Sequence, residues 1–189
     1  MYKYVLASKS PRRRELLTNI GYEFEVMESD FDESRVSKEL DPELYVKELA
    51  MFKAMSLVKK VPFDTIVIGA DTVVVHDGKI LGKPLGRSEA IEMLSLLSGS
   101  VHYVYTGVCA VRSNDAKTVA QCEVTAVHFR ELDISEIEYY VDTFSPYDKA
   151  GAYGIQEYAG VFVSKIEGDY FNIVGLPVCR LNTIIKTEF

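Results

Sequence analysis

The sequence predicts an α/β protein whose helices pack on one mixed, twisted sheet. Helical and strand patterns alternate along the first half of the 189-residue chain, and two long strand patterns follow. The run TIVIGA at residues 65–70 is a continuous, largely β-branched stretch, which is typical of a fully buried strand. No repeat, low-complexity segment or long linker divides the chain, so we expect a single domain over residues 1–189.

Pro-containing start signals define the helices of the first half. Ser10-Pro11 is a typical N-cap followed by a first helical residue, and it predicts a helix over 12–20. Asp41-Pro42 predicts a longer helix that ends near Lys60. Strands are predicted at 4–7, 23–27 and 65–70, and residues 72–75 continue the last strand or begin another.

Turn signals organise the second half. The sequence HDGK at 76–79 is typical of a hairpin turn, and SNDA at 113–116 separates two strands of a longer hairpin. Strands are expected at 101–112, 118–130 and 161–166, and helices at 88–98, 134–143 and about 176–186. The segment SPYDKAGAYGIQ at 145–156 is interpreted as a loop.

Composition excludes several classes of protein. The net charge of −7 argues against general nucleic-acid binding, and the apolar runs are too short to span a membrane. The N-terminus lacks the apolar stretch of a secretory signal. The three cysteines form no C-x-x-C pair, so neither a disulfide framework nor a zinc site is expected, and a cytoplasmic location is predicted.

Three consecutive arginines occupy an unfavourable place. Arg12, Arg13 and Arg14 fall in the first turn of the first predicted helix, where free amides and the helix dipole favour anions. One interpretation is that a bound anion lies between the arginines and the helix N-terminus. The alternative is that the side chains extend into solvent.

Two charged residues interrupt apolar patterns. Asp71 lies between the runs IVIGA and TVVV, so it needs a partner, a metal or a catalytic role, or else it satisfies backbone amides at a strand break. Lys53 shares a helix face with Val46, Ala50 and Leu57. Its ammonium group reaches either solvent or a phosphate.

Three further segments carry polar groups with open interpretations. Lys83 lies in the Gly/Pro loop LGKPLG and is either solvated or phosphate-binding. The acidic loop at 28–34, which includes Glu33, has oxygen ligands suited to Mg²⁺ or is simply solvated. Gln156 either hydrogen-bonds a base edge or caps a turn. Basic groups, carboxylates and a helix N-terminus together favour a phosphate-bearing ligand.

These residues carry a family resemblance that spans nearly the whole chain. The sequence resembles the Maf family of nucleotide pyrophosphatases, which is also associated with septum formation. The matching blocks are LASKSPRRRELL (6–17), FDES (31–34), KA (53–54), GADTVV (69–74), GKP (82–84), DKAGAYGIQ (148–156) and GDYFNIVGLP (168–177).

The resemblance implies the mixed-sheet fold of inosine-triphosphate pyrophosphatases and hydrolysis of a nucleoside triphosphate to the monophosphate and pyrophosphate. It implies a divalent cation, Mg²⁺ or Mn²⁺, held by Glu33, Asp71 or both, with Asp71 as the catalytic residue. It assigns phosphate binding to the remaining polar positions Ser8, Arg13, Lys53 and Lys83.

The GADT and GIQ blocks resemble the branch of the family that acts on dTTP and UTP. In that branch the specificity positions correspond to Arg12, Thr72 and Gln156, whereas Arg14 has no assigned role. The resemblance also implies a nucleoside triphosphate as ligand and a homodimer, and the composition favours neither nucleic-acid nor membrane partners. A non-catalytic nucleotide sensor and a nucleic-acid-binding division regulator are the alternatives.

Overall fold

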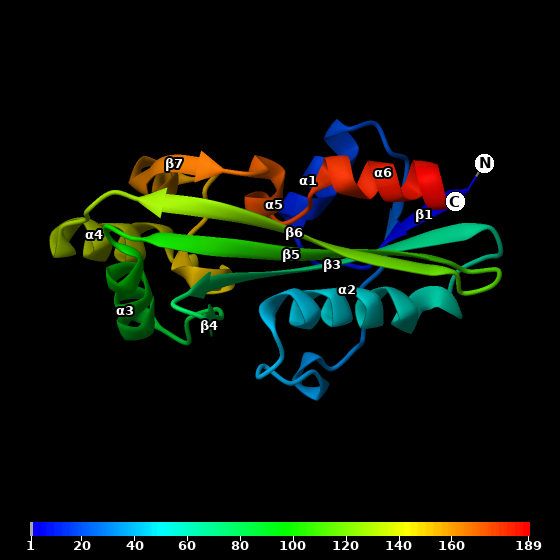
Figure 1. The fold of residues 1–189 in the computed structure, drawn as a ribbon, viewed down its shortest axis with the longest axis horizontal. Coiled ribbons are helices and arrows are strands. Elements are labelled where there is room, and N and C mark those ends of the chain that lie inside the picture. Colours follow the sequence, from blue (N-terminus) through cyan, green and yellow to red (C-terminus); the bar gives the residue numbers. More distant parts are fainter. Residues whose placement is uncertain (1) are drawn as a thin grey trace. The chain divides into compact units, whose positions relative to one another are not determined.

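The computed structural model describes residues 2–189, whose seven strands form one sheet in the order β2-β1-β3-β5-β6-β7, with β4 paired to β3 (Figure 1). The strands are β1 (Lys3–Leu6), β2 (Glu25–Val26), β3 (Thr65–His76), β4 (Lys79–Leu81), β5 (Val101–Arg112), β6 (Thr118–Phe129) and β7 (Val163–Glu167). Strand β1 pairs in parallel with β2 and β3, whereas β4 and β7 are antiparallel to β3 and β6. The predicted α/β class with a mixed sheet is therefore confirmed.

The helices begin at the predicted start signals. They are α1 (Pro11–Asn19), α2 (Pro42–Val58), α3 (Arg87–Leu97), α4 (Ile134–Phe144), α5 (Tyr170–Val174) and α6 (Val178–Glu188). Ser10 caps α1 and Asp41 caps α2, each followed by a proline at the first helical position. The predicted hairpin at 76–79 is also present, because His76 pairs with Lys79.

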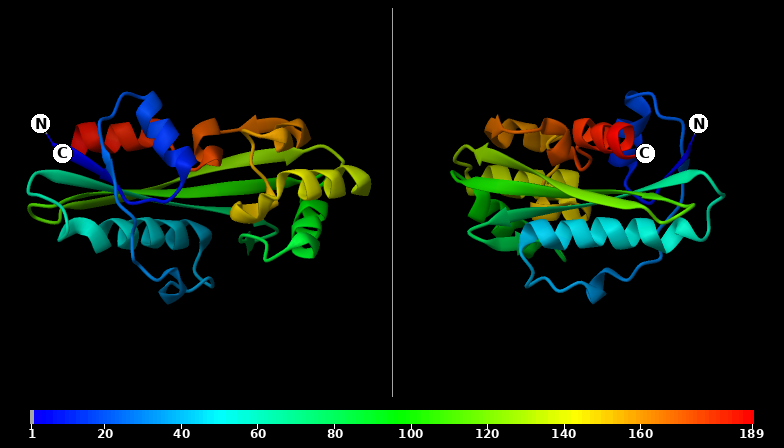
Figure 2. Two further views of the ribbon diagram at one scale, coloured as in Figure 1. Left: turned by 180° about the vertical axis from the view of Figure 1, so that it is seen from behind. Right: turned by 45° about the vertical axis from the view of Figure 1, so that its right-hand side comes forward.

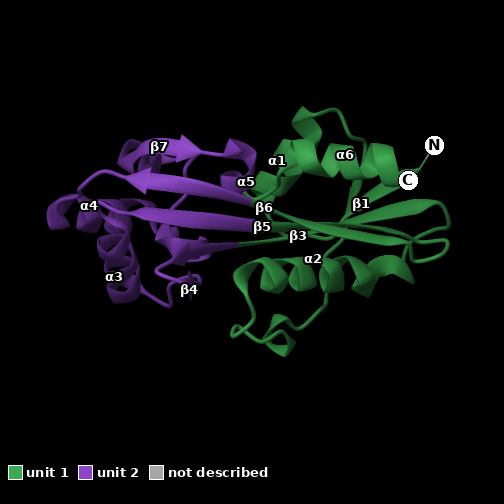
Figure 3. Ribbon diagram, in the orientation of Figure 1, with its two compact units in different colours: residues 1–72, 106–123, 175–189 green, residues 73–105, 124–174 purple. Residues whose placement is uncertain are grey.

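The described chain divides into two compact units (Figure 3). Unit 1 consists of residues 1–72, 106–123 and 175–189, and unit 2 consists of residues 73–105 and 124–174. Strands β3, β5 and β6 contribute residues to both units. The single domain expected from the sequence stays a prediction.

In unit 1, α1 and α6 cover one face of the sheet and α2 covers the other (Figure 2). Two glycines let α2 approach the sheet closely. A Cβ atom on Gly69 would lie 2.1 Å from the carbonyl oxygen of Ala50, and one on Gly107 would lie 2.1 Å from that of Val46. Because these obstacles are backbone atoms, a larger residue at either position displaces the helix.

The core of unit 2 contains a buried histidine. His102 Nε2 lies 2.8 Å from the hydroxyl oxygen of Tyr153, and the Phe129 ring packs edge-on against both rings. Burial, together with smaller contributions from the nearby His76 and His128, lowers the pKa of His102 to about 3. This core position gives His102 a structural role.

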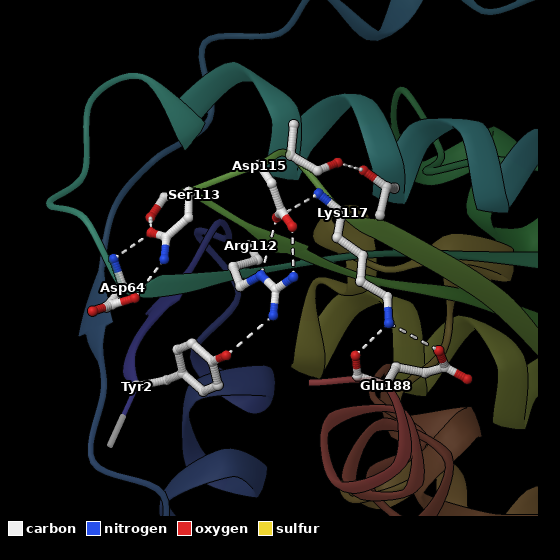
Figure 4. Close-up of polar contacts among 10 residues, drawn as sticks. Tyr2, Asp64, Arg112, Ser113, Asp115, Lys117 and Glu188 are labelled. Atoms are coloured by element: carbon white, nitrogen blue, oxygen red, sulfur yellow. Dashed lines mark hydrogen bonds and ion pairs between the residues drawn. The ribbon is translucent and has the colours of Figure 1, made fainter.

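Residues at the tip of the β5–β6 hairpin contact Tyr2, near the N-terminus, and Glu188, near the C-terminus (Figure 4). Arg112 donates hydrogen bonds to Asp115 and, over 3.1 Å, to the hydroxyl oxygen of Tyr2. Lys117 donates to the backbone and side chain of Glu188. The Arg112 guanidinium holds the pKa of Asp115 well below its ordinary value.

The sequence prediction is wrong at several boundaries of short elements. Residues Tyr158–Phe162 form a 3-10 turn, so the strand predicted from 161 begins at Val163. The segment interpreted as a loop at 145–156 contains two more 3-10 turns, and the five-residue helix α5 was not predicted. One-turn helices contain too few residues to show a 3.6-residue apolar period.

Replacing Gly107 with alanine is expected to destabilise unit 1 by about 1–3 kcal/mol, because the added methyl group meets the α2 backbone. Urea denaturation followed by circular dichroism measures the loss. Gly82→Ala is the matched control, since within residues 2–189 no atom outside its two chain neighbours lies within 4 Å of the Cβ position at Gly82. Equal stability of the two variants would contradict the close approach of α2.

Acid is expected to destabilise the protein through His102. Unfolded His102 has a pKa near 6.5, so between that value and about 3 the unfolded chain binds more protons than the folded chain. His102 therefore leaves the free energy of unfolding unchanged above about pH 6.5 and lowers it as the pH falls toward 3. Urea midpoints measured at about pH 7 and about pH 5 should differ less in His102→Gln than in the wild type. The same difference in both proteins would show that another group is responsible.

Candidate active site

Asp71 and Lys53 form a buried ion pair in unit 1. The Lys53 ammonium nitrogen lies 2.5 Å from Asp71 Oδ1, and the exposed fractions of the two side chains are 11% and 13%. Asp71 follows Gly69 and Ala70 on β3, opposite the stretch of α2 that carries Lys53. The close contact between α2 and β3 therefore brings the two charges together. Of the alternatives left open for Asp71, the structure shows a charged partner.

Lys53 also binds a second carboxylate. Its ammonium nitrogen lies 2.7 Å from Glu33 Oε1, and the Glu33 side chain is 57% exposed. The ammonium therefore reaches two carboxylates of the protein rather than solvent, and phosphate binding by Lys53 stays a prediction. One cation thus lies between two acids, one buried and one open to solvent.

The segment that carries Glu33 packs along α2 through several side-chain contacts. The Phe31 ring stacks on Phe52 with centroids 4.9 Å apart, and the hydroxyl oxygens of Ser29 and Ser56 lie 3.0 Å apart. Asp30 forms an ion pair with Lys60 at 2.7 Å. Asp32 accepts a hydrogen bond from the Ser34 amide and so begins the 3-10 turn η1 (Glu33–Arg35). These contacts position Glu33 over Lys53 without a regular helix or strand.

Arg13 turns away from the start of α1 toward the interior of unit 1. Its Nε donates to the carbonyl oxygen of Gly175 over 2.7 Å. Its Nη2 donates to Thr72 Oγ1 over 3.0 Å, and its Nη1 donates to Ser8 Oγ over 3.3 Å. Burial lowers the pKa of Arg13, whereas the charges of Asp71 and Glu33 oppose that shift. Three neutral oxygens hold this guanidinium, and Asp71 is its nearby countercharge.

The three consecutive arginines differ in exposure. Arg13 is half-buried and hydrogen-bonded as described, Arg12 is half-buried, and Arg14 is exposed. The solvent interpretation therefore fits Arg14 but not Arg13. Ser8 is buried and also accepts a hydrogen bond from the Ser10 amide, which links the first strand to the start of α1.

Two predicted site residues belong to unit 2. Lys83 is exposed in the loop after β4, and Gln156 is exposed in the loop between the 3-10 turns η3 (Ala150–Ala152) and η4 (Tyr158–Phe162). Lys149 in the same segment is buried and forms ion pairs with Asp148 and Glu157 at 2.7 and 3.4 Å. These ion pairs hold the segment that presents Gln156.

The carboxylates of Glu33 and Asp71 suit a cation that is bound jointly by the protein and by phosphate oxygens of a substrate. Residues 2–189 contain no group of three or more His, Cys, Asp or Glu side chains placed to hold a metal ion. Glu33 and Asp71 nevertheless both contact the Lys53 ammonium nitrogen, so the two carboxylates lie close together. Mg²⁺ commonly binds through one or two carboxylates together with substrate phosphates, so this donor set fits such a cation.

Sequence reasoning missed two residues that contact the site. Gly175 supplies its carbonyl oxygen to Arg13 and adopts a φ of 118°, which favours glycine. Thr106 on β5 lies with its hydroxyl oxygen 2.9 Å from that of Thr72. Gly175 falls in the block at 168–177 that carries the family resemblance, whereas no local pattern distinguishes Thr106 from other strand threonines.

Comparisons with known proteins agree along nearly the whole chain. The family described as Maf-like protein matches residues 3–188. A protein named dTTP/UTP pyrophosphatase from Thermoanaerobacter sp. (strain X514) is 54% identical over 187 residues, covering 99% of this chain and 97% of the relative. A protein of the same name from Alkaliphilus oremlandii (strain OhILAs) is 50% identical, covering 100% of this chain and 97% of the relative.

Solved structures show the same fold at low sequence identity. The Ham1 protein of Staphylococcus aureus has a TM-score of 0.55 and 12% identity, covering 99% of this chain and 100% of that chain. A HAM1 protein from Coxiella burnetii has a TM-score of 0.52 and 15% identity, covering 98% and 99%. Within residues 2–189, none of the helices combines the length and apolar character needed to cross a membrane.

Replacing Arg13 with lysine is expected to lower the stability by about 1–3 kcal/mol, because one ammonium group cannot reach all three acceptors of the guanidinium fork. Thermal unfolding in the absence of ligand measures this loss. Arg14→Lys is the control on the same helical turn and should leave the stability unchanged, since Arg14 is exposed. A wild-type melting temperature for Arg13→Lys would contradict the anchoring role.

Proposed function

Because this chain belongs to the Maf family, we propose that it hydrolyses dTTP and UTP to the monophosphate and pyrophosphate. The observation that carries this proposal is Lys53 bound between Asp71 and Glu33, with Arg13 anchored beside Asp71 through Thr72. The names of the relatives support the pyrimidine substrates. Such an activity would serve a house-cleaning role toward normal or modified pyrimidine nucleotides.

Asp71 is the proposed general base. It orients a water molecule and takes its proton while the water oxygen forms a bond to the α-phosphorus. The bond between the α-phosphorus and the bridging oxygen breaks, and that oxygen leaves with the pyrophosphate. Lys53 fixes the direction of the Asp71 carboxylate through the 2.5 Å contact.

Cationic side chains stabilise the negative charge of the phosphates. Arg13 presents a guanidinium whose orientation Ser8, Thr72 and Gly175 already fix, so little reorganisation is needed when a phosphate binds. The Lys53 ammonium is shared by two carboxylates and is the second such group. Lys83, from the loop after β4, is proposed as the third.

Glu33 and Asp71 would hold a divalent cation together with phosphate oxygens of the substrate. When bound, Mg²⁺ or Mn²⁺ supplies Lewis-acid polarisation of the phosphoryl oxygens. Glu33 suits this task because its side chain is 57% exposed and can move from Lys53 toward an entering cation.

Base selection is proposed to depend on Arg12, Thr72 and Gln156. Gln156 is exposed and its amide can both donate and accept, which suits the edge of a pyrimidine. The Thr72 hydroxyl contacts Arg13 and Thr106, so its contribution includes the placement of the guanidinium. A cytoplasmic homodimer without nucleic-acid partners and a link to septum formation stay predictions.

Product analysis with Mg²⁺ or Mn²⁺ tests the proposal. The panel contains dTTP, UTP, CTP, GTP, ATP, ITP and 7-methyl-GTP, and the assay distinguishes pyrophosphate from orthophosphate. We expect pyrophosphate chiefly from dTTP and UTP, and a loss of at least about a hundredfold in Asp71→Asn with the fold intact. Asp77→Asn is the matched control, because the Asp77 side chain is 88% exposed in the β3–β4 turn.

Other outcomes would change the assignment. Turnover of a different nucleotide would retain the class of enzyme and remove the specificity roles of Arg12, Thr72 and Gln156. Normal activity in Asp71→Asn would remove Asp71 from the mechanism. Nucleotide binding without turnover, in folded protein supplied with metal, would favour the nucleotide sensor.

A further inference from the structure

A chain of hydroxyl groups extends from Arg13 into the interior of unit 1. Arg13 Nη2 donates to Thr72 Oγ1 over 3.0 Å, and Thr72 Oγ1 lies 2.9 Å from Thr106 Oγ1. Thr106 is fully buried on β5, directly before Gly107, where α2 contacts the sheet. The oxygen of Thr106 is therefore held at a fixed distance from that of Thr72.

The orientation of the Thr72 hydroxyl decides whether it can serve Arg13. A hydroxyl group has one proton and two lone pairs, and it rotates about its C–O bond. If its proton pointed toward Arg13, the guanidinium would lose an acceptor in a buried place. When Thr72 donates its proton to Thr106, both of its lone pairs stay available to accept from Arg13. By accepting that proton, Thr106 stabilises the orientation in which the Thr72 hydroxyl accepts from Arg13.

We propose that Thr106 is a positioning residue, which orients the Thr72 hydroxyl so that Arg13 is held ready for the phosphates of the substrate. Thr106 acts through Thr72 and Arg13 and needs no contact with the substrate. This inference rests on the proposed function for its substrate, but its hydrogen-bond geometry stands on the structure alone. It also gives Thr72 a role toward the phosphates that does not depend on the base.

A comparison within the chain separates this role from simple packing. Thr65 is also a fully buried strand threonine of unit 1, on β3, and its hydroxyl has no hydrogen-bond partner among residues 2–189. A valine has nearly the shape of a threonine and retains the methyl group while removing the hydroxyl. The hydroxyl is therefore dispensable at Thr65, whereas at Thr106 its removal changes the surroundings of Arg13.

The test compares Thr106→Val, Thr106→Ser and Thr65→Val. Isothermal titration with inorganic triphosphate and Mg²⁺ measures phosphate binding, and steady-state kinetics with dTTP and UTP measure kcat and KM. We expect Thr106→Val to weaken triphosphate binding and to lower kcat/KM by about threefold to tenfold, by the same factor for both nucleotides. Thr106→Ser retains the hydroxyl and should stay within about twofold of the wild type, as should Thr65→Val.

A double-mutant cycle shows whether Thr106 acts through Thr72. In a Thr72→Val background the change Thr106→Val should have no further effect on triphosphate binding, because the hydroxyl that it orients is absent. Independent, additive effects would overturn the proposal. If Thr106→Val does not fold, Thr106→Ala replaces it, and its comparison with Thr106→Ser again isolates the hydroxyl.

The remaining outcomes also decide the question. If folded Thr106→Val binds triphosphate as tightly as the wild type, the proposal is overturned. It is also overturned if Thr106→Val and Thr106→Ser are equally impaired, because that result would indicate that packing, and not the hydroxyl, is responsible. If the wild type hydrolyses neither dTTP nor UTP, the proposed function fails. The triphosphate titrations still report whether Thr106 positions Arg13 in that case.

Discussion

The close contact between helix α2 and strands β3 and β5 determines the geometry of the candidate site. Gly69 and Gly107 bring the helix backbone so near the sheet that no side chain fits between them. This contact buries the charged pair of Lys53 and Asp71, with ammonium and carboxylate 2.5 Å apart. A buried charge is tolerated only with a partner, so the packing of apolar residues and the pairing of charges depend on each other.

Lys53 and Arg13 stand in different electrostatic surroundings. Lys53 contacts two carboxylates, so this group of three carries an excess of negative charge that suits a divalent cation. Arg13 is held by the neutral oxygens of Ser8, Thr72 and Gly175, and its charge suits a phosphate. Because Asp71 and Thr72 are consecutive, the proposed sites for cation and anion adjoin along β3. A triphosphate chelating a divalent cation matches that arrangement.

Much of the fold could be predicted from the sequence because the signals are local. The N-caps at Ser10 and Asp41 and the buried strand at 65–70 each depend on a few adjacent residues. Asp71 and Lys53 could be recognised as charges within apolar patterns. Their mutual contact could not, and the contact of Arg13 with Gly175 joins residues 162 positions apart. Short 3-10 turns and the one-turn helix α5 escaped prediction because they bury too few residues to leave a periodic pattern.

The acceptors of Arg13 also explain why a cation persists at the start of α1. Thr72, Thr106 and Gly175 are the unit 1 residues at three of the four places where the chain passes between the units, since the divisions fall at 72/73, 105/106, 123/124 and 174/175. Arg13 binds Thr72 and Gly175 directly and reaches Thr106 through Thr72. One guanidinium thus links the unit 1 residues at three of these four places, and no uncharged side chain offers as many donors in a fixed fork. The unfavourable helix dipole is offset by these hydrogen bonds and by the charge of Asp71, so the arginine fulfils a structural task even before a phosphate binds.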